Sequence, residues 1–490
     1  MTETRQGDGD DVTTSAVDTP ALAPIGASKR IDAMDILRGF ALIGILFMNI
    51  EWFGRPIADL GSFDETLTGV DHAAGWLVRC FIEGKFYKLF ALLFGMGFAV
   101  MLIRAREAGR PFGWWFTRRM FVLLVIGLLH MIFIWPGDIL HDYAIAGFAM
   151  LGWVALMQRP RLKRFDHAGA YLKTGLVWLS FLFVASTAAA IAYGVGYDHA
   201  ELAERWQEER EIAVLVAEKL ALPAPETALD DEDDESAADE EEEERELSRE
   251  ERIEERASEI ADSRRGHDER VEEEIASYVD PSYFEATKFR ARQTLRRLQS
   301  TIPFTLVILM PIFLVGYWFV ASGVLRNHRQ NRHIFRPMAW IGGIFGLFFT
   351  VAGLILLQYP TAEDQQTIIA TGSTIFLLGQ YLMSAAYLGI IVLLLSHDKW
   401  RQRLQRLAPM GRMALTNYIM QTAILAVIFH GYGFGLWGEV SRAPQMLLAG
   451  VILVMQGFLS AWWLARFRFG PLEWLWRSAT YWSLQPMKAR

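Results

Sequence analysis

Long apolar blocks constrain this chain more than any other feature of its sequence. Each block is close to the roughly 20 helical residues that cross a hydrocarbon core of about 30 Å. Hydrophobic residues make up 52% of the 490 residues and are concentrated in these blocks. The sequence therefore predicts an all-α fold, a polytopic membrane helical bundle of about ten transmembrane helices. The predicted spans are residues 35–54, 86–104, 119–136, 138–157, 171–193, 302–325, 338–357, 372–395, 413–430 and 444–465.

The loops between the predicted spans alternate in charge. Four loops are rich in arginine and lysine, and so are the segments before the first span and after the last. With about ten spans, all of these basic segments lie on one side of the membrane, which the positive-inside rule makes the cytoplasm. We therefore expect a multi-pass protein with both termini in the cytoplasm. The basic loops are residues 104–119, 159–165, 326–336 and 397–412.

The segment between the fifth and sixth spans is then expected outside the cytoplasm. Residues 230–245 hold 12 acids and one arginine, and without them the net charge changes from −8 to +3. Glu, Arg and Ala dominate the rest, which favours solvated helix, with disorder around residues 222–238. The basic end, residues 284–299, has two interpretations. It binds an anionic head group or substrate, or it is an amphipathic helix on the membrane surface.

These patterns divide the chain into parts. We expect a disordered cytoplasmic N-terminus at residues 1–30, an N-terminal membrane half of five helices at 31–197 and an acidic extracytoplasmic insertion at 198–301. A C-terminal membrane half of five helices at 302–470 and a cytoplasmic tail at 471–490 follow. The single cysteine, Cys80, excludes an internal disulfide and a cysteine-rich metal site.

The first predicted span carries polar residues that a membrane helix normally avoids. Asp35, Arg38 and Asn49 share one helix face, and Asp35 and Arg38 are three residues apart, close enough to pair. Ionisable groups at membrane depth usually face a bundle interior or a water-filled cavity. The structural alternative is that Arg38 reaches the head groups with Asp35 as its partner and Asn49 links helices.

The third and fourth spans form a hairpin with ionisable residues near its turn. His130 lies towards the end of the third span, and Asp138, His141 and Asp142 lie at the start of the fourth. A histidine oriented by a carboxylate is the usual arrangement for a general base. The alternatives are that Asp138 caps the fourth helix and that the histidines are packing residues. No ligand spacing supports zinc, so we expect no metal.

Further polar groups lie in other spans. Asn417 and Gln421 share a face of the ninth span near Arg412, and interhelical packing is their structural alternative. Lys85 and Lys88 lie at the start of the second span. "GMG" at residues 95–97 indicates close approach between helices.

Five stretches together resemble the YeiB-like family of bacterial membrane proteins, which is classed as a domain of unknown function. They are "DILRGFALIGILFMN", "KFYKLFALLFGMGFA", "RRMFVLLVIGLLH", "GDILHDYAIAG" and "GRMALTNYIMQT". The first is also similar to the first helix of heparan-alpha-glucosaminide N-acetyltransferase and related transmembrane acyltransferases, through Asp35, Arg38, Gly39 and Asn49. Such proteins carry an acyl group from a cytoplasmic CoA thioester to an acceptor outside, with a histidine implicated.

The wider resemblance implies a mechanism. Basic residues at the cytoplasmic side receive acyl-CoA as a co-substrate, since arginine suits phosphates. His130, helped by Asp138 or His141, deprotonates an extracytoplasmic acceptor, and Asn49 stabilises the developing oxyanion. The expected acyl-CoA-binding residues are Asp35, Arg38, Asn49, Arg118, Arg119, Arg412 and Asn417.

The resemblance also implies a setting, the bacterial cytoplasmic (inner) membrane. Membrane lipids are expected partners, the acceptor is a sugar, a lipid or an envelope polymer, and no nucleic acid or metal is expected. The acyl group, the acceptor and the oligomeric state stay open.

Two other functions compete with acyl transfer. A transporter or exporter of a small metabolite would use the same polar residues as a substrate path. It would need no CoA and would survive loss of His130. A non-catalytic scaffold would instead depend on the acidic insertion. It would tolerate changes both at the expected acyl-CoA-binding residues and at His130.

Overall fold

The computed structural model describes residues 31–62, 64, 66–195, 199–221, 248–358 and 365–488. Across these ranges the chain is almost wholly helical, and its only β-pairing is an isolated bridge between Phe467 and Lys488. The disorder predicted for residues 1–30 and 222–238 falls outside the described residues.

The described helices confirm a polytopic helical membrane bundle. Nine helical runs are long and apolar enough to cross a membrane, and a pair bent by 74°, residues 398–412 with 414–429, raises the number to ten. The helices that supply most of these long runs are α1 (Asp32–Asn49), α3 (Lys85–Glu107), α4 (Gly113–Phe133), α5 (Leu140–Met157), α6 (Ala168–Val195), α9 (Tyr283–Phe304), α10 (Met310–Ala321), α11 (Arg332–Gln358), α12 (Gln365–Leu395), α15 (Ala414–Phe429) and α16 (Arg442–Leu464). A π-helical turn, Thr305–Leu309, joins α9 to α10.

Several shorter helices were not predicted as separate elements. They are α2 (Gly69–Phe81), α13 (Asp398–Leu404), α14 (Ala408–Arg412) and α17 (Pro471–Tyr481), with 3-10 turns at Ile50–Phe53, Ile57–Asp59, Lys163–Phe165 and Gln405–Leu407. Hydropathy missed them because each is shorter than a span and carries polar residues along part of its length.

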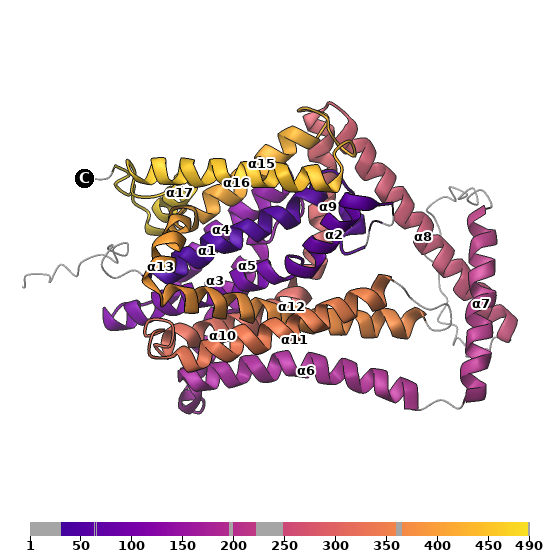
Figure 1. Cartoon of the computed structure of the whole chain (residues 1–490), viewed down its shortest axis with the longest axis horizontal. Helices are drawn as coiled ribbons and strands as arrows, with labels where there is room; N and C mark the ends of the chain where they lie inside the picture. Colours follow the sequence, from indigo (N-terminus) through magenta and orange to yellow (C-terminus); the bar gives the residue numbers. More distant parts are fainter. Residues whose placement is uncertain are drawn as a thin grey trace, which may run out of the picture.

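The long helices lie side by side in Figure 1, with α13 and α17 at one end of the bundle and α7 and α8 at the other. At the end of the bundle with α13 and α17, several helix termini meet: the C-terminal ends of α3, α10 and α16 and the N-terminal ends of α4 and α15. This end of the bundle is here called the arginine-rich end, because seven arginines line one cavity there. The turn between α4 and α5 belongs to the opposite end.

Two helices, α7 (His199–Ala221) and α8 (Arg249–Val279), lie in the segment for which the sequence predicts solvated helix. Ser248 and Glu251 form a reciprocal capping box at the start of α8. The basic stretch 284–299 lies within α9, whose Phe289, Arg290 and Thr294 are buried. Arg290 Nε donates to Ile132 O at 3.0 Å, so this stretch packs against α4 rather than only facing solvent.

Glycines allow a very close crossing of α3 with α10 in the bundle core. A Cβ on Gly316 of α10 would overlap Leu92 O of α3, and one on Gly95 of α3 would overlap Phe313 O of α10. Backbones this close leave no room for a side chain. The prediction that "GMG" serves helix packing is confirmed at Gly95.

Candidate functional site

A cavity of about 1360 Å³ enters the bundle from the arginine-rich end. Its walls come from α1, α3, α4, α5, the segment after α10, the α14–α15 junction and the C-terminal segment around α17. The outer part of the cavity holds most of the charge, and deeper lining residues of α1 and α3, such as Leu42, Ile45 and Phe90, are apolar. The lining arginines are Arg38, Arg104, Arg119, Arg326, Arg412, Arg468 and Arg477.

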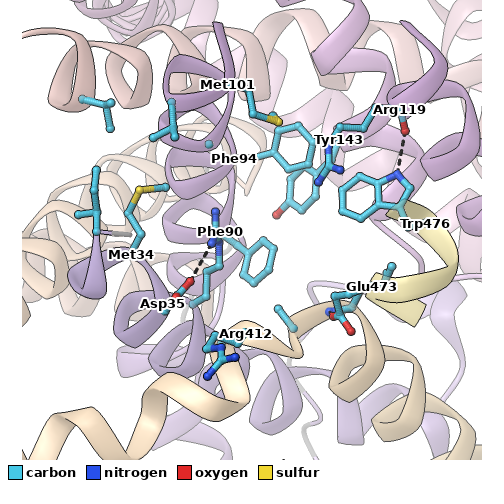
Figure 2. A pocket seen from close by; sticks show the side chains of 18 of the residues that line it. Met34, Asp35, Phe90, Phe94, Met101, Arg119, Tyr143, Arg412, Glu473 and Trp476 are labelled. Carbon is cyan, nitrogen blue, oxygen red and sulfur yellow. Dashed lines mark hydrogen bonds and ion pairs between the residues drawn. The ribbon is translucent and has the colours of Figure 1, made fainter. Parts of the chain in front are cut away.

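A crossing of α1 with α14 builds one side of the mouth. Arg38 Nη1 donates to Asp35 Oδ1 at 3.1 Å within α1, so the predicted pair is formed. A Cβ on Gly411 would overlap Asp35 O, so only glycine allows this approach. The crossing brings Arg412 to the same side of the cavity as Asp35, as Figure 2 shows.

The C-terminal helix α17 builds the facing side. The Arg119 guanidinium lies 3.6 Å from the centroid of the Trp476 ring, and Trp476 Nε1 donates to Arg119 O at 2.9 Å (Figure 2). Glu473 accepts hydrogen bonds from the backbone N–H groups of Leu415 and Thr416, which caps the start of α15. Burial raises the pKa of the Glu473 carboxyl, and these hydrogen bonds oppose the shift.

Beyond the apolar part of the cavity lies a buried polar group centred on Asp138. His130 Nδ1 is 3.0 Å from Asp138 Oδ1, and Tyr418 donates its hydroxyl to the same oxygen at 3.2 Å. Asp138 Oδ2 accepts from the backbone N–H groups of Leu140 at 2.8 Å and His141 at 3.2 Å. Asp138 thus contacts both the start of α5 and His130, so the helix-capping contact and the contact with His130 are formed by the same side chain.

The electrostatics of Asp138 favour its ionised form. Burial alone would raise the pKa of this carboxyl, but the hydrogen bond from the His130 side chain and the nearby His141 ring hold it below its usual range. A carboxylate only accepts hydrogen bonds, so the His130 Nδ1 atom carries a proton. In the neutral imidazole, Nε2 is then the basic nitrogen.

The two histidines have different surroundings. His130 Nε2 lies 2.7 Å from the Thr422 hydroxyl oxygen of α15. His141 Nε2 lies 3.1 Å from Thr301 Oγ1, and its Nδ1 is 3.5 Å from Asp138 Oδ2, beyond a normal hydrogen bond. His130 is therefore the histidine that Asp138 directly orients, and His141 faces α9.

A glycine on α4 allows the buried polar side chains around Asp138 to come together. A Cβ on Gly127 would lie 2.7 Å from His141 N and 3.0 Å from Asp138 Oδ2. Contacts this short are essentially absent for real side chains, so α4 approaches the start of α5 closely only because residue 127 is glycine. That approach places His130, three residues further along α4, against Asp138.

Four of the predicted acyl-CoA-binding residues line the cavity: Asp35, Arg38, Arg119 and Arg412. Three others do not. Asn49 lies one turn beyond Ile45, and Arg118 is next to Arg119 but outside the lining. Asn417 donates to Met410 O at 3.2 Å and to Ser460 Oγ at 2.9 Å, which ties α15 to α14 and α16, the interhelical packing role.

Several residues of the site were not predicted from the sequence. Tyr143 and Tyr418 close the inner part of the cavity, and Thr422 contacts His130 although 292 residues separate them. Glu473 and Trp476 lie in the predicted tail. No local pattern marks any of them, since their roles depend on contacts between distant helices.

Within the described ranges, no group of three or more His, Cys, Asp or Glu side chains is arranged to hold a metal ion. Asp138 and His130 instead form hydrogen bonds with each other and with threonine, tyrosine and backbone groups.

Comparisons with known proteins identify relatives of unknown function. Residues 319–483 match the family described as "Protein of unknown function (DUF418)". The chain is 29% identical to the uncharacterized protein YxaH of Bacillus subtilis (strain 168) over 475 residues, 95% of this chain and 98% of that protein. It is 25% identical to the uncharacterized protein YeiB of Escherichia coli (strain K12) over 461 residues, 92% and 96% of the two chains. No solved structure matches the chain.

Proposed function

Because the chain is a YeiB-like multi-pass membrane protein with a DUF418 region, we propose that it is an acyltransferase of the bacterial inner membrane. It moves an acyl group from cytoplasmic acyl-CoA to an extracytoplasmic sugar, lipid or envelope acceptor. One observation carries the proposal: an arginine-lined cavity ends beside a histidine that a buried carboxylate orients.

The chemistry of the cavity suits acyl-CoA. Arginine binds phosphate groups through its planar fork, and the lining arginines outnumber the lining acids Asp35, Glu107 and Glu473. The apolar residues beyond them suit the pantetheine arm and an acyl chain. The volume of the cavity, about 1360 Å³, exceeds the roughly 300–1,000 Å³ of ordinary small-molecule pockets. The positive-inside rule supports a cytoplasmic mouth.

The group around His130 suits base catalysis. Asp138 holds the Nδ1–H tautomer, so Nε2 is the atom that takes a proton from an attacking hydroxyl. Tyr418 joins the two regions because it lines the cavity and also donates to Asp138. Asn49, one turn beyond the cavity-lining Ile45, is proposed as an oxyanion donor.

The first test is binding of acetyl-CoA, and of a longer acyl-CoA, to the protein in detergent by calorimetry. We expect wild type to bind and Arg38→Ala and Arg412→Ala to bind at least about tenfold more weakly, since each removes a charge-assisted contact. Arg161→Ala is the control, because it removes an exposed positive charge outside the cavity. No binding of either acyl-CoA by folded wild type would overturn the proposal.

A second candidate function follows from the shape of the same cavity. It opens at one end of the bundle and stops at Tyr143 and Tyr418, which is the form of a transporter open to one side. Transport of a small anion would not require CoA. Uptake or efflux that persists in His130→Gln, with no acyl-CoA binding by wild type, would favour this function instead.

A further inference from the structure

We propose that the Thr422 hydroxyl is the nucleophile of a two-step transfer and carries the acyl group as an ester between donor and acceptor. This inference rests on the proposed function and adds a covalent intermediate to it. Its basis is the buried arrangement of Thr422, His130 and Asp138 on α15, α4 and the turn before α5.

The three groups form a continuous hydrogen-bonded series. The Thr422 hydroxyl oxygen is 2.7 Å from His130 Nε2, and His130 Nδ1 is 3.0 Å from Asp138 Oδ1. A hydroxyl, a base and a group that orients the base, within reach of one another, are the requirements for an activated nucleophile. All three side chains are buried, with Thr422 at 1%, His130 at 3% and Asp138 at 0% exposure.

The direction of the hydrogen bonds favours donation from Thr422 to His130. Asp138 requires the proton on Nδ1, so Nε2 of the neutral imidazole has a lone pair that needs a donor. A threonine within a helix often donates to a carbonyl of its own helix instead. Here the nearest such acceptor, Ile419 O, is 3.0 Å away, longer than the 2.7 Å to Nε2.

Thr422 lies on the continuation of the cavity wall. Leu415 and Tyr418 line the cavity, and Thr422 follows on the same face of α15 one turn later. On α4, the cavity-lining Leu123 is followed on one face by His130. The Tyr418 ring lies beside His130, with 5.4 Å between their centroids. For a thioester in the cavity to reach the Thr422 hydroxyl, the buried side chains around that hydroxyl, including Tyr418, must move aside.

The first step balances without a further reactant. The Thr422 oxygen forms a bond to the thioester carbonyl carbon while its proton moves to His130 Nε2. The carbon–sulfur bond breaks, and the departing thiolate takes the proton to leave as free CoA. In the second step an acceptor hydroxyl attacks the threonine ester, loses its proton to Nε2 and restores the Thr422 hydroxyl. Direct attack by the acceptor on the thioester would use His130 but leave no acyl-protein.

The experiment uses the full chain in detergent with radiolabelled acetyl-CoA and a longer acyl-CoA, without any acceptor. We expect covalent label on the denatured wild-type protein, placed on Thr422 by peptide mass spectrometry, and exchange of free CoA into acyl-CoA. Thr422→Ser should keep both signals, and Thr422→Val, which has the same shape without the hydroxyl, should lose both. Thr350→Val is the control, because it removes an equally buried hydroxyl on α11.

The outcomes separate this inference from the proposed function. Wild type that binds acyl-CoA but gives neither label nor exchange overturns the threonine intermediate and leaves acyl transfer standing. Label on another residue, or label and exchange that survive Thr422→Val, overturns it as well. Wild type that does not bind acyl-CoA overturns both.

Discussion

Asp138 connects structure and proposed chemistry at the scale of single residues. Its two oxygens accept from the α5 backbone, from Tyr418 and from His130. An asparagine could still cap α5 with its one amide oxygen, but its NH2 group would then face His130 and, being a donor, could not hold the Nδ1–H tautomer. The carboxylate therefore matters more for the base than for the helix.

Asp138→Asn should lower acyl transfer by roughly 10²–10⁴-fold, the usual contribution of an oriented general base. Binding of acyl-CoA should change little, because Asp138 does not line the cavity. The measurement is the rate of free CoA release with envelope extract as the acceptor source. Asp142→Asn, at a neighbouring carboxylate that does not contact His130, is the comparison. Equal losses in both variants would contradict the role of Asp138.

Glu274 gives the fold a pH-dependent contact outside the membrane spans. Burial raises the pKa of this carboxyl to about 7, although hydrogen bonds from the backbone N–H groups of Ile57 and Ala58 oppose the shift. The folded state therefore holds this proton more tightly than the unfolded state, whose pKa is near 4.5. The stabilising contribution is complete below pH 4.5 and is lost as pH rises through 7.

The expected result is a thermal midpoint that falls between pH 5 and pH 8 in wild type. The loss in unfolding free energy from Glu274 is at most about 3 kcal/mol, from about 1.4 kcal/mol for each pKa unit. Glu274→Gln should flatten the profile, whereas Glu285→Gln, at a half-exposed side chain, should not. An unchanged profile in Glu274→Gln would contradict the assignment.

At the scale of helices, glycines allow α3 and α10 to cross in backbone contact. Gly316→Ala adds a Cβ that would overlap Leu92 O, and backbone cannot move aside as a side chain can. We expect a clear loss of thermal stability in detergent, on the order of 1–3 kcal/mol for overpacking. Gly450→Ala on α16, where a Cβ meets open space, is the matched control and should be neutral or slightly stabilising. Similar effects at both glycines would contradict the packing.

The helices that are defined by a long apolar stretch could be predicted from the sequence. Spans such as 138–157 and 444–465 agree closely with α5 and α16, since apolar length alone defines them. The sixth span was expected to begin at 302, but α9, the π-helical turn and α10 form one run from 283 to 321. Hydropathy did not predict that α9 continues into α10, because α9 carries many basic residues and buries only one face.

The site could be predicted only where its residues are close in sequence. His130 and Asp138 are eight residues apart across a short turn, so their meeting was foreseeable. Asp35 and Arg38 are three apart on one helix. Thr422 and Trp476 join the site through α15 and α17, and contacts between helices distant in sequence leave no periodic pattern in a single chain.

At the scale of the whole molecule, the proposal requires a fixed orientation. The arginine-rich end should face the cytoplasm, and α8 and the start of α9 should lie outside. Cysteine can be introduced at exposed positions after replacement of the single Cys80, which is buried. We expect a membrane-impermeant maleimide to label Glu285→Cys in intact cells and Arg161→Cys only after permeabilisation. The reverse pattern would place the cavity mouth outside and contradict a cytoplasmic donor.

The most direct test of the central claim is a cryo-electron microscopy map of the protein with a non-hydrolysable acyl-CoA analogue. We expect density in the cavity, with the phosphates among arginines such as Arg38 and Arg412 and the thioester position near Tyr418. Density on the lipid-facing surface alone, or an empty cavity at saturating analogue, would contradict it.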